Sequence, residues 1–88
     1  MNIVSKDKIL EIVNNNLEDT SIQTEQFDLE LDTVGMDSIT FIKIIVDLEE
    51  SFELEIPDEF LLLLKMNTIN KMYETLSFVS EKKLNRTI

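Results

Sequence analysis

The scarcity of turn-forming residues is the feature that most constrains the fold of this chain. Its 88 residues include a single glycine, Gly35, and a single proline, Pro57. Tight hairpin turns favour glycine at positions of positive φ, and proline suits other turn positions, so few β-hairpins can form here. A chain of this length supports one compact domain. We therefore expect residues 1–88 to form a single all-α domain.

Apolar side chains recur at helical spacing in three longer segments and one short one. Ser5 and Thr68 are candidate N-caps for the first and last segments, because their hydroxyl groups can accept backbone N–H groups at a helix start. Pro57 suits the start of the short segment, since its fixed φ matches a first-turn position. The predicted helices cover about residues 5–17, 38–52, 58–64 and 68–82.

Residues 18–36 form a long polar connection between the first two predicted helices. A connection of this length in a small domain is usually functional or carries a short turn of its own. Four apolar side chains could attach it to the core: Phe27, Leu29, Leu31 and Val34.

Three acidic residues of this connection, Asp28, Glu30 and Asp32, have the alternate spacing with which an EF-hand calcium loop begins. In such a loop the sixth position is glycine and the twelfth is a bidentate glutamate. Those positions hold Thr33 and Ile39 here, so we expect no metal site.

Acidic residues outnumber basic ones by 18 to 8, which gives a formal charge of −10. This charge repels nucleic acid and anionic lipid headgroups, so we expect neither as a partner. It would steer a basic protein surface toward the chain, or serve only to keep a small protein in solution. The chain has no cysteine and no histidine, and therefore no thiol nucleophile and no side chain that ordinarily titrates near neutral pH. We expect that it is not an enzyme.

No targeting or membrane segment is recognisable. No basic segment after Met1 leads into an apolar signal core, and the longest apolar run, residues 60–64, is too short to cross a bilayer. We expect a cytoplasmic protein without membrane insertion. Because no Pro/Gly-rich linker is present, we expect a free-standing monomer, with a domain excised from a larger protein as the alternative.

The segment 38–52 carries more apolar surface than one-sided packing requires. Five large side chains form a stripe that is sufficient to anchor a helix in a bundle: Phe41, Ile44, Ile45, Leu48 and Phe52. Ile39, Ile42 and Val46 form a second strip on another flank, at positions i, i+3 and i+7. Either the other helices and the long connection cover this strip, or it is a docking patch for a partner protein.

The residues that lead into this segment, Gly35-Met36-Asp37-Ser38-Ile39, resemble the Gly-x-Asp-Ser-Leu/Ile motif of acyl and peptidyl carrier proteins. Further segments look like the family's Leu-Glu-Glu-x-Phe helix end, its Ile-Pro-Asp-Glu turn and the Thr-Val/Ile that opens its last helix. They occur in family order and spacing at residues 47–52, 56–59 and 68–69. The resemblance covers about residues 34–76, and the ordered set is far more specific than an Asp-Ser pair alone.

The resemblance implies a four-helix carrier-protein bundle, with three longer helices, a short third helix and a long loop between helices 1 and 2. It implies that Ser38 receives a 4′-phosphopantetheine arm from coenzyme A, on which acyl or aminoacyl intermediates are held as thioesters. Asp37 would help to present the serine to the phosphopantetheinyl transferase and its magnesium. The other implied partners are an acyl- or aminoacyl-loading enzyme and synthase or condensing enzymes. The implied recognition face consists of Ile39, Ile42, Lys43, Val46, Glu49 and Glu50.

A serine at a helix start is physically suited to this modification. The unpaired N–H groups and the positive end of the helix dipole can accommodate a phosphodiester, and Gly35 allows a sharp turn into the helix. The arm would also carry the only thiol of the protein. The alternative explanation for Ser38 is that it is an ordinary N-cap.

Three positions depart from the family pattern. Thr40 and Lys43 stand where fatty-acid-synthesis carriers usually have acidic residues, which dilutes the negative charge of the recognition face. Glu53 stands where glycine is frequent, and we expect it to affect the loop conformation alone. We therefore favour a carrier for specialised polyketide, nonribosomal peptide or lipopeptide assembly. A housekeeping fatty-acid-synthesis carrier and an unmodified carrier-like interaction domain are the alternatives.

Overall fold

The structure, a computed structural model, describes residues 3–85, with side chains described for residues 3–82. This part of the chain contains helices and no strand: α1 (Lys6–Asn16), α2 (Ser38–Phe52) and α3 (Ile69–Asn85), with the 3₁₀ turns η1 (Thr24–Gln26), η2 (Leu31–Thr33), η3 (Asp58–Phe60) and η4 (Leu63–Lys65). The predicted all-α class is confirmed, and α2 has the predicted bounds. None of the helices in the described residues has the length and apolar character needed to span a membrane.

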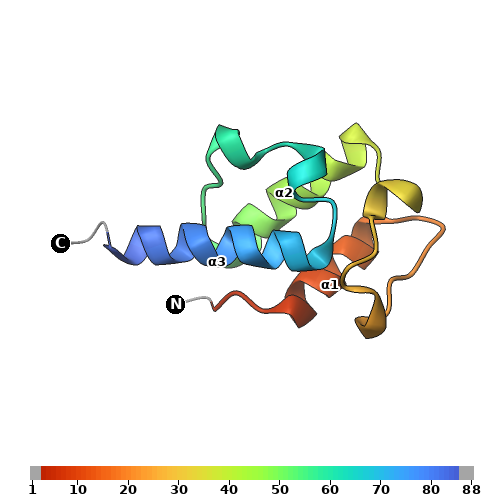
Figure 1. Ribbon diagram of the computed structural model, residues 1–88, viewed down its shortest axis with the longest axis horizontal. Coiled ribbons are helices and arrows are strands. Elements are labelled where there is room, and N and C mark those ends of the chain that lie inside the picture. The colour runs from red at the N-terminus through yellow and green to blue at the C-terminus, as the bar shows by residue number, and fades with distance from the viewer. Residues whose placement is uncertain (1–2, 86–88) are drawn as a thin grey trace.

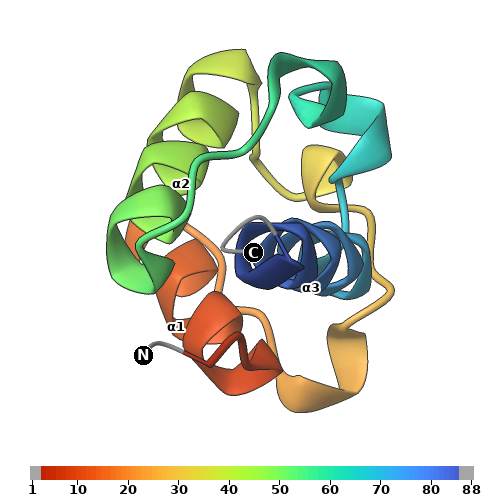
Figure 2. The ribbon, with the colours of Figure 1, turned by 90° about the vertical axis from the view of Figure 1, so that its left-hand side faces the viewer.

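The helices pack around one core, and α3 is enclosed by the rest of the chain. Figure 2 shows α1 and α2 on one side of α3 and the connection 18–37 passing along the other side. In Figure 1 the segment 58–65 lies on the same side of α3 as α2. The core stripe predicted for α2 is buried, together with side chains of α1 and α3: Phe41, Ile44, Ile45, Leu48 and Phe52, with Ile9, Ile12, Val13, Ile69, Met72 and Leu76.

Side-chain caps explain where α1 and α3 begin. The Ser5 hydroxyl accepts the N–H of Lys8 at 3.2 Å, and the Thr68 hydroxyl accepts the N–H of Lys71 at 3.0 Å. Each bond satisfies a donor that a helix start would otherwise leave unpaired. Both predicted caps are confirmed.

The connection 18–37 is attached to the core by side chains that the sequence only partly revealed. Asn14 of α1 binds Ile22 twice, accepting its N–H at 2.7 Å and donating to its carbonyl at 3.0 Å. Ile22 and Met36 are buried, although each stands alone among polar neighbours and gave no periodic signal. The predicted anchors also contact the core, with Leu31 buried and three others half-buried: Phe27, Leu29 and Val34.

The short third helix of the predicted bundle is a pair of 3₁₀ turns rather than a continuous α-helix. Leu62, between η3 and η4, has an extended backbone. Leu61 and Leu63 are half-buried, whereas Leu62 and Leu64 are exposed. This alternation has a period of two residues, which an α-helix cannot produce. The segment 58–65 is therefore held to the core by every second leucine.

α2 ends at a residue with a left-handed backbone. Glu53 has a φ of 54° and a ψ of 45°, and its N–H donates to the carbonyl of Glu49. Glycine adopts this conformation without penalty, whereas for other residues it is unfavourable by about 1 kcal/mol. The expectation that Glu53 affects the loop conformation alone stays a prediction.

Glu53→Gly should therefore raise the free energy of unfolding by about 1 kcal/mol, because it relieves the left-handed backbone at the end of α2. Glu53→Ala is the matched control, since it removes the carboxylate and retains the unfavourable φ. Urea unfolding followed by circular dichroism measures both variants. A Glu53→Gly variant no more stable than Glu53→Ala would contradict this explanation.

Candidate functional site

The chain before α2 is shaped so that two polar residues face outwards. Gly35 has a φ of 114°, which residues with a side chain rarely adopt. The next side chain, Met36, is only 1% exposed, and its N–H donates to the carbonyl of Leu31 at 3.0 Å. This turn and this anchor leave Asp37 and Ser38 exposed at the start of α2.

Asp37 is the N-cap of α2. Its Oδ1 accepts the N–H of Thr40 at 2.8 Å, and this hydrogen bond from Thr40 is the main cause that lowers the pKa of the Asp37 carboxyl below its ordinary value. The ionised carboxylate thus stabilises the helix start at pH values above its pKa in the unfolded chain, and that contribution is lost as the pH falls through the lowered pKa. A further role of Asp37 in presenting its neighbour to a transferase stays a prediction.

Ser38 is the first residue of α2 and not its cap. Because Asp37 supplies the cap, the serine hydroxyl is not required there. Ser38 Oγ has no hydrogen-bond partner among the residues that the structure describes. The alternative explanation of Ser38 as an ordinary N-cap is therefore wrong, and its hydroxyl is available for other chemistry.

The surroundings of Ser38 fit a covalently attached phosphodiester. The hydroxyl is exposed, so a bulky group on it displaces no packed side chain. The helix start provides a positive dipole end, which favours an anionic group. The adjacent carboxylate of Asp37 already accepts a backbone N–H, so that part of its charge is compensated.

The second apolar strip of α2 is exposed. Ile39, Ile42 and Val46 are 69%, 54% and 45% exposed, so neither the long connection nor another helix covers them. Of the two explanations that the sequence left open, cover by other parts of the chain is wrong. Their contact with a partner enzyme stays a prediction.

Two further exposed apolar side chains, Leu62 and Leu64, were missed from the sequence. Figure 1 shows their segment, 58–65, above α3, where α2 also lies. A run of leucines is ordinarily interpreted as buried, and the sequence held no signal that alternate members would face outwards.

The acidic residues of α2 differ in how they are engaged. Asp47 Oδ2 accepts a hydrogen bond from Asn16 Nδ2 at 2.9 Å, and Glu49 Oε2 accepts the N–H of Ile56 at 2.8 Å. Asp47 and Glu49 are half-buried, whereas Glu50 is exposed. Glu49 thus anchors the segment after α2 through its hydrogen bond with Ile56. The predicted face residues that the structure leaves exposed along α2 are Ile39, Ile42, Lys43, Val46 and Glu50.

Two acidic residues of the connection 18–37, Asp28 and Asp32, have structural partners. Asn67 Nδ2 donates to Asp32 Oδ1 at 3.0 Å, and Asn70 Nδ2 donates to Asp28 Oδ1 at 2.6 Å. These bonds hold the connection against the start of α3. Within the described residues, no group of three or more His, Cys, Asp and Glu side chains could hold a metal ion.

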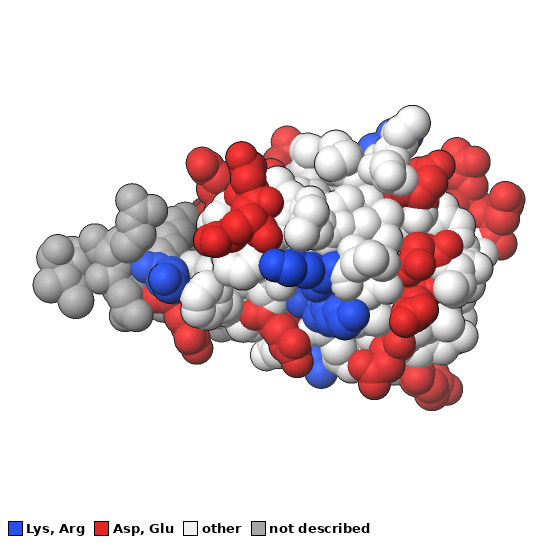
Figure 3. Space-filling model, turned by 45° about the horizontal axis from the view of Figure 1, so that its top comes forward, with Lys and Arg blue, Asp and Glu red and all other residues white. Residues whose placement is uncertain are grey.

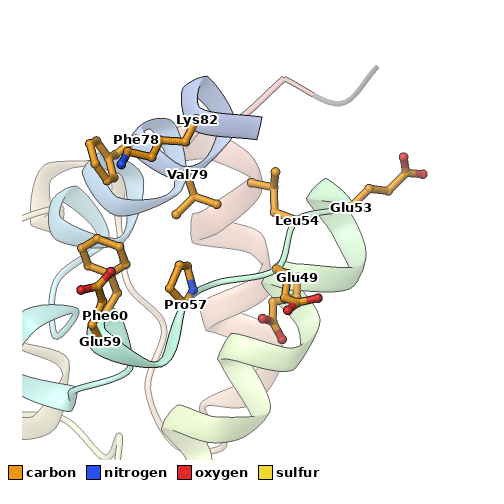
Figure 4. Close-up of a pocket in the computed structure, with 10 residues that line it drawn as sticks. Glu49, Glu53, Leu54, Pro57, Glu59, Phe60, Phe78, Val79 and Lys82 are labelled. Carbon is orange, nitrogen blue, oxygen red and sulfur yellow. The ribbon is translucent and has the colours of Figure 1, made fainter. Parts of the chain in front are cut away.

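A surface cavity of about 890 Å³ lies at the opposite end of α2 from Ser38. It is formed between the segment 53–60 and the residues 78–82 of α3. Figure 4 shows Phe60 and Phe78 projecting toward each other there, with ring centroids 5.7 Å apart. Lys82 Nζ lies 5.2 Å from the centroid of the Phe78 ring. Glu49, which also lines the cavity, is about 16 Å along the helix from Ser38 at a rise of 1.5 Å per residue. The cavity is therefore separate from the exposed hydroxyl.

Comparisons with known proteins agree with this geometry. Residues 7–76 match the family described as the phosphopantetheine attachment site. The acyl carrier protein of Kocuria rhizophila is 42% identical over 64 aligned positions, which cover 65% of this chain and 75% of that protein. No solved structure matches the chain. With an exposed serine at the start of α2 and a family match that spans α1 from its second residue and all of α2, the chain belongs to the phosphopantetheine-binding carrier proteins, which hold 4′-phosphopantetheine covalently and are carriers rather than enzymes.

Proposed function

We propose that Ser38 is the residue that carries 4′-phosphopantetheine, and that the chain holds acyl or aminoacyl intermediates for specialised polyketide, nonribosomal peptide or lipopeptide assembly. The observation that best supports the attachment is the exposed Ser38 hydroxyl, which has no partner among the described residues. When bound, the group supplies a thiol that holds these intermediates as thioesters. The chain has no cysteine of its own, so loading is confined to one position.

The proposed partners follow from the same role. A phosphopantetheinyl transferase modifies Ser38, a loading enzyme supplies the acyl or aminoacyl group, and synthase or condensing enzymes consume it. The exposed face of α2 beside Ser38 is the proposed contact surface for these enzymes. The cytoplasmic location expected from the sequence stays a prediction.

Two residues near Ser38 favour a specialised pathway. Thr40 and Lys43 make this end of α2 less acidic than in the fatty-acid-synthesis carriers that the motif resembles. Housekeeping fatty-acid synthesis is the second candidate, because the relative from Kocuria rhizophila is named an acyl carrier protein without further specification.

Incubation of the unmodified chain with coenzyme A, Mg²⁺ and a broad-specificity phosphopantetheinyl transferase tests the attachment. We expect the intact mass to rise by one phosphopantetheine group, and peptide fragmentation to locate that group on Ser38. No gain in mass, or a gain located on another residue, would contradict the proposed function.

A second measurement separates the two candidate pathways. The modified chain is offered malonyl-CoA and the malonyl transferase of a bacterial fatty-acid synthase, with a fatty-acid carrier as the reference. If the chain serves a specialised pathway, its less acidic surface should slow malonyl transfer at least about tenfold relative to the reference. Equal rates would favour the fatty-acid role.

A further inference from the structure

The exposed charge in the middle of α2 differs from the charge of the chain as a whole. Asp47 and Glu49 are half-buried and hydrogen-bonded to Asn16 and Ile56. The exposed charged side chains between the two helix ends are one lysine, Lys43, and one glutamate, Glu50. These two charges cancel, although the chain carries a formal charge of −10. Asp47 and Glu49 keep their charges, so the helix as a whole is acidic and Lys43 is the one basic residue of α2.

Lys43 borders the exposed apolar strip formed by Ile39, Ile42 and Val46. It follows Ile39 by four residues and precedes Val46 by three, and residues at these spacings are neighbours on a helix surface. Among the described residues Lys43 has no ion-pair or hydrogen-bond partner. Its ammonium group is a free positive charge at the edge of an apolar patch.

A protein that covers Ile39 and Val46 must also displace water from around Lys43. Burying an ammonium group without a partner is strongly unfavourable, and pairing it with a carboxylate offsets that loss of hydration. A basic partner surface would instead place like charges together. The covering surface therefore has to be apolar, with an acidic group opposite Lys43.

We propose that the phosphopantetheinyl transferase that modifies Ser38 binds the outer face of α2 through an apolar surface that bears a carboxylate, and that this carboxylate pairs with Lys43. This inference rests on the proposed function. The proposed pairing is a direct contact between the two proteins and differs from the long-range electrostatic attraction between their net charges. The acidic side chains that Figure 3 shows toward both ends of another face of the molecule act over about 10 Å at 0.1 M salt.

The test uses the full chain and the transferase encoded in the same genome. The kcat/KM for modification is measured for wild type, Lys43→Arg, Lys43→Gln and Lys43→Glu, each at about 0.05 M and about 0.5 M NaCl so that screening is varied. Lys8→Glu on α1 is the charge control, because it changes the net charge by the same amount at an exposed site remote in sequence from α2; it also removes the surface ion pair between Lys8 and Glu11, a contact of small energy. Thermal melting confirms that each variant is folded.

We expect Lys43→Glu to lower kcat/KM at least about tenfold at low salt, mainly through KM, and the loss to shrink at high salt. Lys43→Gln should show a smaller loss, Lys43→Arg should resemble wild type, and Lys8→Glu should change kcat/KM less than about twofold. Replacing the paired transferase carboxylate by lysine should restore modification of Lys43→Glu.

The results that would contradict the Lys43 pairing can be distinguished from the result that would contradict the proposed function. A Lys43→Glu chain modified as fast as wild type, or faster, would overturn the proposed pairing while the proposed function stands. Equal losses in Lys43→Glu and Lys8→Glu would show a general charge effect and would also overturn it. A wild-type chain that gains no phosphopantetheine would remove the proposed function and this inference together.

Discussion

Ser38→Ala should abolish incorporation of phosphopantetheine while leaving the chain folded. The phosphodiester forms on the serine oxygen, and alanine offers no atom in its place. The fold should be unaffected because Ser38 is exposed, its hydroxyl makes no hydrogen bond within the described residues, and it is not the helix cap. Alanine is also a better helix former than serine, so the free energy of unfolding should change by no more than about 0.5 kcal/mol.

Ser21→Ala is the matched control for this prediction. Ser21 is an exposed serine in the connection 18–37 and does not stand at a helix start. Intact mass after incubation with coenzyme A and the transferase should show full modification of Ser21→Ala and none of Ser38→Ala. Equal gains in mass for the two variants would place the attachment on another residue.

Ile42→Asp and Ile45→Asp should have opposite consequences, although the two residues stand three positions apart in α2. Ile45 is 3% exposed, and a carboxylate there would lose its hydration without a partner. The penalty of several kcal/mol is comparable to the whole stability of a domain of this size, about 5 kcal/mol, so Ile45→Asp should unfold the chain. Ile42 is largely exposed, and Ile42→Asp should change the free energy of unfolding by less than about 1 kcal/mol.

The folded Ile42→Asp variant should nevertheless be modified at least about tenfold more slowly, because it places a charge in the centre of an apolar contact. Circular dichroism during thermal melting and the rate of mass gain provide the two measurements. Val46→Asp should behave like Ile42→Asp. If either variant unfolds, that residue belongs to the core; if both are modified at the wild-type rate, the strip is not a docking patch.

Much of the helical framework could be predicted because its signals are local. The apolar stripe of α2 repeats at the helical period over residues 38–52, and the caps at Ser5 and Thr68 act on N–H groups only three residues away. The segment 58–65 was harder to predict. Its consecutive leucines carry no helical period, and contact with the core selects alternate ones.

The candidate site also combines features that local sequence signals predict with features that only the packing reveals. The motif placed Ser38 at a helix start, but only the hydrogen bond from Thr40 to Asp37 shows that the cap is Asp37 and that the serine hydroxyl is unused. The sequence left open whether the second strip of α2 was covered. Its exposure depends on where residues distant along the chain pack.

By itself, the sequence determined the three main helices, the turn at Gly35 and the position of Ser38 at the start of α2, since each depends on residues within a few positions of one another. Only the tertiary structure decided which carboxylates are hydrogen-bonded by residues distant in the sequence. Asp47 is engaged by Asn16, 31 positions away, and Asp32 by Asn67, 35 positions away. Such pairings form only when distant segments pack together, and no local pattern encodes them.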